Sequence, residues 1–254
     1  MIAYRRPEHV VIARLLGVLD ADLFERCRCF FAGGTAIVLQ HGEYRLSRDV
    51  DFLCADRDGY RRLRSLAVGQ GAAGLFRSPE VGTVRDFRTD QYGIRAALAY
   101  EGEQLRFEIV REGRITLSGG IDPVLRVPVL APADQQAEKL LANADRCHDP
   151  AVACRDVIDL GALVHATGEI SSAALAKALD AYGDDVVGKL VYAVNHLADR
   201  RHLARAATTL QMDADVATSL VDAVRREIGR LWPDVRLEVP AVERQHEVDP
   251  ERDP

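Results

Sequence analysis

Two aspartates, Asp49 and Asp51, stand one residue apart in the stretch RLSRDVDFLC. Val50 and Phe52 alternate with them, and this alternation is typical of a β-strand. Successive side chains of a strand point to opposite faces, so both carboxylates are expected on the same face. Neighbouring carboxylates repel each other, and each raises the other's pKa unless a positive charge lies between them. The spacing therefore predicts a site for a divalent cation.

A glycine pair, Gly33 and Gly34, precedes the aspartates at the end of an apolar run. With Thr35 it forms the expected N-terminus of a short helix over residues 35–40. Helix N-termini present unpaired N–H groups and partial positive charge, and glycine lets a phosphate approach the backbone closely. We therefore expect Gly33, Gly34 and Thr35 to hold the triphosphate of a nucleotide.

A third acidic residue is expected on a later strand. The segments YGIRAALAY and QLRFEIV have strand patterning and are separated by the turn signal EGE. Three glutamates in this region are candidates, Glu103, Glu108 and Glu112, and we choose Glu108 because it is central in QLRFEIV and faces away from the apolar side. Three carboxylates beside a phosphate site favour two Mg²⁺ ions, which prefer hard oxygen ligands and accompany substrate phosphates.

The elements that position these residues divide the chain into two halves. Helical spacing over residues 8–29 is followed by the glycine pair, a strand at 48–54, a helix in DRDGYRRLRSL and strands between residues 84 and 117. A segment rich in Gly and Pro, residues 118–133, marks a boundary. Helices are then expected at residues 134–144, 152–166, 172–181, 186–205 and 214–231.

This order predicts an α+β fold, in which a mixed sheet flanked by helices is followed by a helical domain. The expected domains are residues 1–130, residues 131–232 and an acidic, disordered tail at residues 233–254. The cleft between the first two domains is where we expect the nucleotide.

The composition narrows the class of protein. The chain of 254 residues is 48% hydrophobic and has a formal net charge of −6, which argues against a generally basic protein that coats nucleic acid. Much of that negative charge lies in the tail. The sequence has no apolar run of about 18 residues and no signal peptide, so we expect a soluble cytoplasmic protein without a membrane partner. The five cysteines are expected to be reduced, and the seven histidines form no ligand set in the sequence.

Four segments together resemble a known family: GGTAIVLQHGEYRLSRDVDF, RFEIV, AEKLLANADR and RDVIDL. They are similar to the polymerase-beta-like nucleotidyltransferases, and within these to the AbiEii/AbiGii-type toxin nucleotidyltransferases. That family is associated with bacterial abortive infection and toxin–antitoxin pairs. The resemblance covers roughly residues 30–163.

The resemblance implies roles for individual residues. It implies that Asp49, Asp51 and Glu108 bind the metal, and that Lys139 reaches the nucleotide phosphates. It also places Asp156 in an essential motif, although Arg155 stands where many relatives have lysine. The nucleotide-binding residues are expected to be Gly33, Gly34, Thr35, Arg45, Ser47 and Lys139. The alternatives are an ordinary surface lysine at position 139 and a structural salt bridge from Asp156 or Asp159 to an arginine.

The function implied is the transfer of a nucleoside monophosphate from an NTP to an acceptor hydroxyl, with release of pyrophosphate. The family suggests the 3′ end of RNA, tRNA in particular, as acceptor, and a cognate antitoxin as partner. A small molecule such as an antibiotic is the alternative acceptor. A catalytically weak protein that only binds an antitoxin is a second alternative, and the intact set of carboxylates counts against it.

Overall fold

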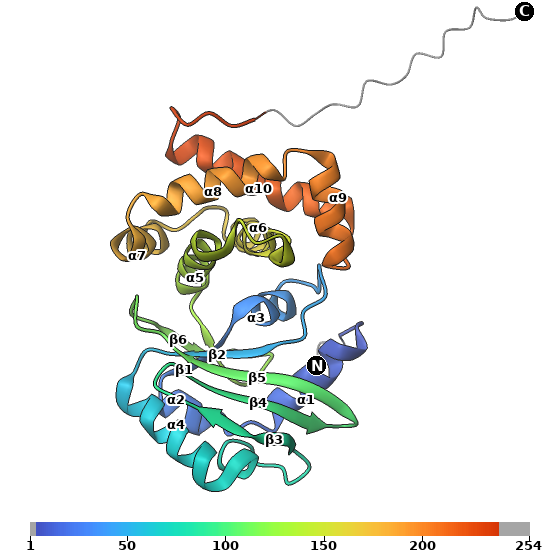
Figure 1. Ribbon diagram of the computed structural model, residues 1–254, viewed down its shortest axis with the longest axis vertical. Helices are drawn as coiled ribbons and strands as arrows, with labels where there is room; N and C mark the ends of the chain where they lie inside the picture. Colours follow the sequence, from blue (N-terminus) through green and yellow to red (C-terminus); the bar gives the residue numbers. More distant parts are fainter. Residues whose placement is uncertain (1–3, 239–254) are drawn as a thin grey trace, which may run out of the picture.

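The computed structural model describes residues 4–238, and its layers are visible in Figure 1. Within these residues, seven strands form one mixed sheet in the order β3-β4-β5-β2-β1-β7-β6. The strands are β1 (Cys29–Ala32), β2 (Val50–Cys54), β3 (Gly82–Thr89), β4 (Gly93–Tyr100), β5 (Glu103–Arg111), β6 (Gly119–Ile121) and β7 (Pro128–Leu130). The central strand β2 runs antiparallel to β1 and parallel to β5.

One face of the sheet carries an aromatic core. Helices α1 (Pro7–Gly17), α2 (Ala21–Arg26) and α4 (Arg57–Gln70) pack there, together with the short 3-10 helix η1 (Gly71–Gly74). The ring of Phe52 lies 4.7 Å from that of Phe24, 5.3 Å from that of Phe31 and 5.8 Å from that of Phe107. Because Phe52 and Phe107 fill this face, the alternate residues of β2 and β5 point to the opposite face.

Helix α3 (Gly33–Gln40) lies on that opposite face, between the sheet and the helices α5 (Pro132–Arg146) and α6 (Arg155–Thr167) (Figure 1). Its buried residue Ile37 belongs to a second core, which is formed by the C-terminal helices. These helices are α5 (Pro132–Arg146), η2 (Pro150–Val152), α6 (Arg155–Thr167), α7 (Ser172–Tyr182), α8 (Asp185–His196), α9 (Arg200–Thr209) and α10 (Ala214–Leu231). α3 therefore links the sheet to the helical half.

Two stretches with continuous helical spacing are interrupted. Residues 8–29 form α1 and α2, because Asp20 caps α2 by accepting a hydrogen bond from the N–H of Leu23 at 3.1 Å. Residues 186–205 form α8 and α9, and Asp199 caps α9 through the N–H of Arg201. Side-chain caps of this kind end one helix and start another while the apolar periodicity continues.

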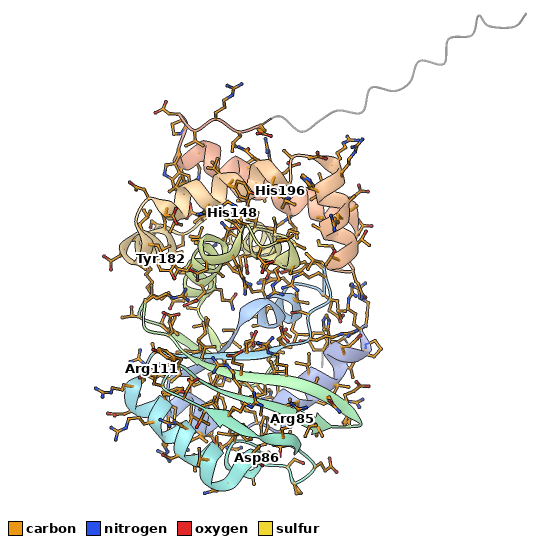
Figure 2. The ribbon with its side chains drawn as sticks, viewed as in Figure 1. Arg85, Asp86, Arg111, His148, Tyr182 and His196 are labelled. Atoms are coloured by element: carbon orange, nitrogen blue, oxygen red, sulfur yellow. The ribbon has the colours of Figure 1, made fainter. Side chains whose placement is uncertain are left out.

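The Gly- and Pro-rich segment predicted as a boundary contains two short strands, β6 and β7, at one edge of the sheet. The other edge strand, β3, carries the exposed side chains of Arg85 and Asp86 (Figure 2). Charges on an edge strand discourage pairing with another sheet.

The predicted α+β class with a mixed sheet followed by helices is confirmed. The division at residues 130 and 131 stays a prediction. Of the expected tail, residues 239–254 lie outside the described residues, whereas Glu238 donates its N–H to Asn195 Oδ1 at 2.9 Å. Across residues 4–238, no helix is both long enough and apolar enough to cross a membrane.

Candidate active site

The strand register puts two of the predicted acids side by side. Asp51 of β2 is opposite Ala32 of β1 on one side and opposite Glu108 of β5 on the other. Since Gly33 follows Ala32 directly, the first residue of α3 also lies next to Asp51. Asp49 stands one residue before β2 begins. The three carboxylates and the glycine pair, distant in sequence, are therefore brought to one place on the sheet.

A cavity of about 230 Å³ lies between this part of the sheet and the helices α5 and α6. Five of the predicted residues line it: Gly33, Asp49, Asp51, Glu108 and Lys139. The other predicted residues, Gly34, Thr35, Arg45, Ser47 and Asp156, do not line it. The cavity walls thus combine carboxylates from the sheet with basic side chains from the helices.

Asp51 carries the clearest electrostatic sign of a ligand site. Burial raises the pKa of its carboxyl group to about 6, and the charges of Asp49 and Glu108 act in the same direction. Lys139 and Arg106 oppose the shift without cancelling it. A carboxylate destabilised by burial and by like charges gains most from a bound cation.

The fit to magnesium rests on Asp49 and Asp51, whose hard oxygens are the donors that Mg²⁺ prefers. Glu108 is engaged elsewhere: Arg95 Nε lies 2.7 Å from its Oε1, and Arg106 Nη2 lies 3.2 Å from its Oε2. Among residues 4–238, no group of three His, Cys, Asp or Glu side chains is arranged to hold a metal ion. Each oxygen of Glu108 meets one arginine, so a further lone pair on each oxygen is left for a cation or a proton.

At each position of the glycine pair, a side chain would clash with a neighbouring residue. Gly33 has φ +70°, and a Cβ built on it would lie 2.9 Å from Asp51 Oδ2. A Cβ on Gly34 would lie 2.0 Å from Arg45 Nη2. The pair therefore admits a carboxylate on the cavity side and a guanidinium on the other side, in addition to any contact with phosphate.

Arg45 lies behind α3 and points to α6. Its Nε and Nη2 donate to Asp159 Oδ1 and Oδ2 at 2.7 and 2.8 Å, and both side chains are buried. Thr35 and Ser47 share a hydrogen bond of 2.7 Å between their hydroxyl oxygens. These three residues hold α3 and the approach to β2 in place, and a nucleotide in the cavity would not meet them directly.

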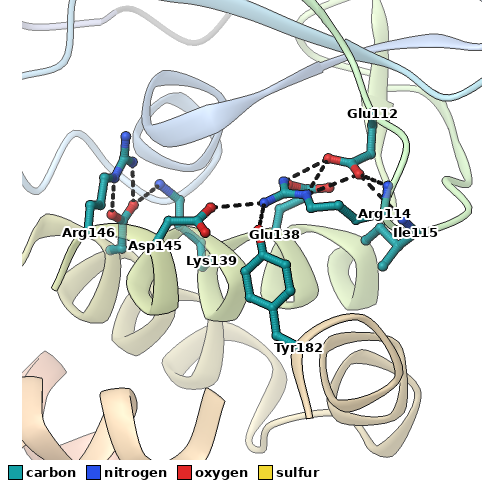
Figure 3. Close-up of polar contacts among 9 residues, drawn as sticks. Glu112, Arg114, Ile115, Glu138, Lys139, Asp145, Arg146 and Tyr182 are labelled. Atoms are coloured by element: carbon teal, nitrogen blue, oxygen red, sulfur yellow. Dashed lines mark hydrogen bonds and ion pairs between the residues drawn. The ribbon is translucent and has the colours of Figure 1, made fainter. Parts of the chain in front are cut away.

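Lys139 connects the cavity to a buried ionic network. Its Nζ lies 3.0 Å from Asp156 Oδ1 and 2.7 Å from Asp159 Oδ2. Arg146 donates to both oxygens of Asp156, at 2.7 and 2.9 Å. Figure 3 shows Lys139 and Arg146 projecting from α5. Lys139 is 5% exposed, so it is no ordinary surface lysine.

The two aspartates of this network have low proton affinity. Burial alone would raise the pKa of Asp159, but Arg45 and Lys139 lower it well below its usual range. Burial is likewise outweighed at Asp156, where Lys139 and Arg146 lower the pKa. Both residues form the salt bridges to arginine that the sequence offered as the alternative to a catalytic role.

Three arginines line the cavity that the sequence analysis did not assign to the site: Arg106, Arg146 and Arg155. Arg155 was noted only as the residue where many relatives have lysine. For the other two a signal was present. Arg106 precedes Glu108 by two residues and therefore shares its face of the strand. Arg146 follows Lys139 by seven residues, which is about two helical turns, so both occupy one face of α5.

A second carboxylate pair borders the cavity. Arg114 lies 2.7 Å from Glu112 Oε2 and 3.0 Å from Glu138 Oε2, and it also donates to Asp145 and Tyr182 (Figure 3). Burial, reinforced by the charge of Glu112, raises the pKa of Glu138 to about 8. Arg114 opposes this shift without cancelling it.

A family model and solved structures of known proteins resemble the chain. A family model described as "Nucleotidyl transferase AbiEii toxin, Type IV TA system" matches residues 14–243. A putative nucleotidyltransferase from H. pylori matches 92% of this chain and 100% of its own, with 14% identity and a TM-score of 0.52. An antigenic nucleotidyltransferase-like protein from Paracoccidioides brasiliensis matches 82% of this chain and 95% of its own, with 14% identity and a TM-score of 0.46. No curated protein matches the chain.

Proposed function

Because the chain belongs to the AbiEii nucleotidyl transferase toxin family, we propose that it moves a nucleoside monophosphate from an NTP to a hydroxyl at the 3′ end of RNA, tRNA in particular, in a magnesium-dependent reaction. Within a type IV toxin–antitoxin system, it would act in the cytoplasm and have a cognate antitoxin as partner. The nucleotidyltransferase activity itself follows from the family. The nucleotide, the metal and the acceptor are the proposed parts.

One observation carries the proposal: Asp51 lies in register between Glu108 and Ala32, the residue that leads into α3, in a cavity that it shares with Lys139. Negative charge on the sheet side suits cations, and positive charge on the helix side suits phosphates. An NTP needs both, because its phosphates reach an enzyme together with a divalent cation.

The chain's own residues divide the work of the reaction. Asp49 and Asp51 would hold the ions, and Lys139, Arg146 and Arg155 would bind the triphosphate. Two Mg²⁺ ions, when bound, stabilise the attacking and the leaving oxygens of an in-line displacement. Glu108, fixed by Arg95 and Arg106, is assigned to accept the proton of the acceptor hydroxyl.

The covalent change is a single exchange at phosphorus. The hydroxyl oxygen forms a bond to the α-phosphorus, the bond to the β-phosphate oxygen breaks, and pyrophosphate leaves. Positioning and electrostatic stabilisation by the side chains described above supply most of the rate.

Asp156 is proposed as a positioning residue. It lies behind Lys139 and Arg146 and contacts both, so it aims two cations at the cavity without lining it. Asp159 holds Lys139 in the same way, and it also anchors Arg45 behind α3. Arg45, Thr35 and Ser47 then support the nucleotide site through α3.

The test follows label from each of the four NTPs in the presence of Mg²⁺ and total RNA. The expected result is label in RNA that depends on Asp51. Transfer that survives Asp51→Ala contradicts the metal assignment, and label in small molecules contradicts the RNA acceptor. Absence of transfer from all four nucleotides favours a protein that only binds its antitoxin.

A further inference from the structure

A second cavity, of about 180 Å³, opens in the helical half between α8, α9 and the segment that joins α5 to α6. Four rings meet there: His148, Tyr192, His196 and His202. Figure 2 shows His148 and His196 on this side of the helical half. The proposed reaction uses none of these rings.

The rings form a continuous row. The centroids of His148 and Tyr192 are 4.2 Å apart, those of Tyr192 and His196 are 6.1 Å apart, and those of His196 and His202 are 3.9 Å apart. The last two pairs are nearly parallel, with interplanar angles of 16° and 13°. Tyr192 is 42% exposed, and His148 and His202 are also exposed. His196 and His202 cover one face of each other, so the rings most available to a ligand are those of His148, Tyr192 and His202.

Basic side chains accompany the rings. Lys189 Nζ lies 3.0 Å from His148 Nε2, and α9 contributes Arg201 and Arg205. The nearby acids are Asp149, which lines the cavity, and Asp199, which caps α9. Arg205 lines the cavity together with the rings. Exposed rings beside cations are the combination with which proteins bind single-stranded nucleic acid, because bases stack on the rings and the cations meet the phosphates.

The histidines do not make a metal centre. Over residues 4–238, no three His, Cys, Asp or Glu side chains are placed to share an ion. Burial, together with the neighbouring His202, lowers the pKa of His196, which favours the uncharged ring. Stacking rather than ligation is therefore the chemistry available to this row.

A single segment of chain, residues 146–155, contributes side chains to both cavities. Arg146 and Arg155 line the catalytic cavity, while the intervening Cys147, His148 and Cys154 line the second. Ala153 and Cys154 both adopt left-handed backbone conformations, with φ of 51°. Such conformations are uncommon outside glycine and tend to persist at functional sites. They form the turn that directs Cys154 to one cavity and Arg155 to the other.

We propose that the ring row is the subsite for the single-stranded 3′ end of the RNA acceptor. The bases before the last nucleotide stack on Tyr192 and His202, whose rings His196 supports from between, and Lys189 and Arg205 meet the phosphates. The strand then crosses the 146–155 segment, so its terminal hydroxyl enters the catalytic cavity. This inference rests on the proposed function, in which RNA is the acceptor.

The experiment measures binding of a fluorescein-labelled single-stranded RNA of about a dozen nucleotides to the full chain by anisotropy. Tyr192→Ala and His202→Ala are each expected to raise Kd about tenfold, in line with the loss of one stacked base. Tyr192→Phe should bind as the unmodified chain does. The matched control is Tyr92→Ala, at an exposed tyrosine in the turn before β4, which should leave Kd unchanged.

Kinetics provide a second measurement that a structural defect would not reproduce. Tyr192→Ala should raise KM for RNA, with kcat and KM for the NTP unchanged. If Tyr192→Ala and Tyr92→Ala change RNA binding equally, or if neither changes it, the subsite is overturned. The subsite is also overturned if Tyr192→Phe loses RNA binding as fully as Tyr192→Ala does.

Failure of the subsite can be told apart from failure of the proposed reaction. Asp51→Asn is expected to abolish transfer while RNA binding at the ring row stays intact. If no NTP is transferred but Tyr192→Ala still weakens RNA binding selectively, the reaction is wrong and the subsite stands. If label enters RNA with all variants binding alike, the reaction stands and the subsite is wrong.

Discussion

Asp156 pairs with Lys139 and Arg146, and Asp159 pairs with Lys139 and Arg45. Within residues 4–238, by contrast, Asp49 and Asp51 form no ion pair. The same lysine, Lys139, faces both pairs. Yet the pKa of Asp159 is lowered and that of Asp51 is raised. Burial raises the pKa of both carboxyl groups, so the difference lies in how completely nearby cations neutralise each carboxylate.

This difference separates structural acids from acids that await a ligand. A buried, fully paired aspartate stabilises the fold only as long as its partners remain. A buried aspartate beside other acids destabilises the free protein and is expected to recover that free energy when a cation binds. Substitutions in either pair of aspartates test this comparison, through activity for one pair and through stability for the other.

The largest expected effect is on activity. Asp51→Asn keeps the size of the side chain and removes the charge, so transfer of nucleotide should fall by about three orders of magnitude or more. The measurement is the rate of label transfer at saturating NTP. Asp58→Asn, at an exposed acid on α4, is the matched control and should retain the full rate. Equal rates for the two variants would contradict the proposal that Asp49 and Asp51 are ligand-binding acids whereas Asp156 and Asp159 are structural ones.

Next in size is a loss of stability. Asp159→Asn leaves the buried guanidinium of Arg45 without its carboxylate, and the free energy of unfolding should fall by about 3–5 kcal/mol. Urea denaturation measures it. Asp222→Asn removes an exposed acid 4.0 Å from Arg225 and should change stability by less than about 0.5 kcal/mol. A small effect at Asp159 would mean that the network is not structural.

A smaller loss is expected from Gly34→Ala. The new methyl group would overlap Arg45 Nη2 and force the guanidinium away from Asp159, which should cost about 2–3 kcal/mol. The cost should shrink when the same change is made together with Asp159→Asn, because the salt bridge is then already lost. Full additivity of the two changes would show that the methyl group acts elsewhere.

The smallest expected effect is a gain in stability. The folded pKa of Asp51, about 6, lies above the ordinary value of 3.8, so in this window the folded chain holds a proton that the unfolded chain releases. Its contribution to stability is present below 3.8 and is lost as pH rises to about 6. At pH 7, Asp51→Asn should therefore be more stable by about 1–2 kcal/mol without Mg²⁺. Urea denaturation from pH 4 to pH 7 should show a flatter profile for the variant.

Much of the architecture was predictable because it depends on local patterns. Alternation put Asp51 and Glu108 on the strand faces where the structure has them, whereas Asp49 directly precedes its strand, and helical spacing indicated the C-terminal helices. The helix breaks at Asp20 and Asp199 were missed, since a capping aspartate does not interrupt apolar periodicity. The resemblance, not any local pattern, singled out Lys139, which lines the cavity.

The rest depends on contacts between distant residues. Arg45 pairs with Asp159 across 114 positions, and no local pattern tells a buried arginine from one that binds phosphate. Glu108 meets Arg95 only because β4 and β5 pair in one particular register. Side-chain roles that arise from such pairings require the tertiary structure.

The parallel pairing of β2 with β5 has a consequence for biosynthesis. Asp51 and Glu108 become neighbours only after the chain has passed through β3 and β4 and returned to the middle of the sheet. Lys139 follows still later along the chain. Because a ribosome releases the N-terminal part first, a nascent chain that ends before α5 has made its acids but not the basic wall opposite them. The enzyme should therefore stay catalytically silent during most of its own translation.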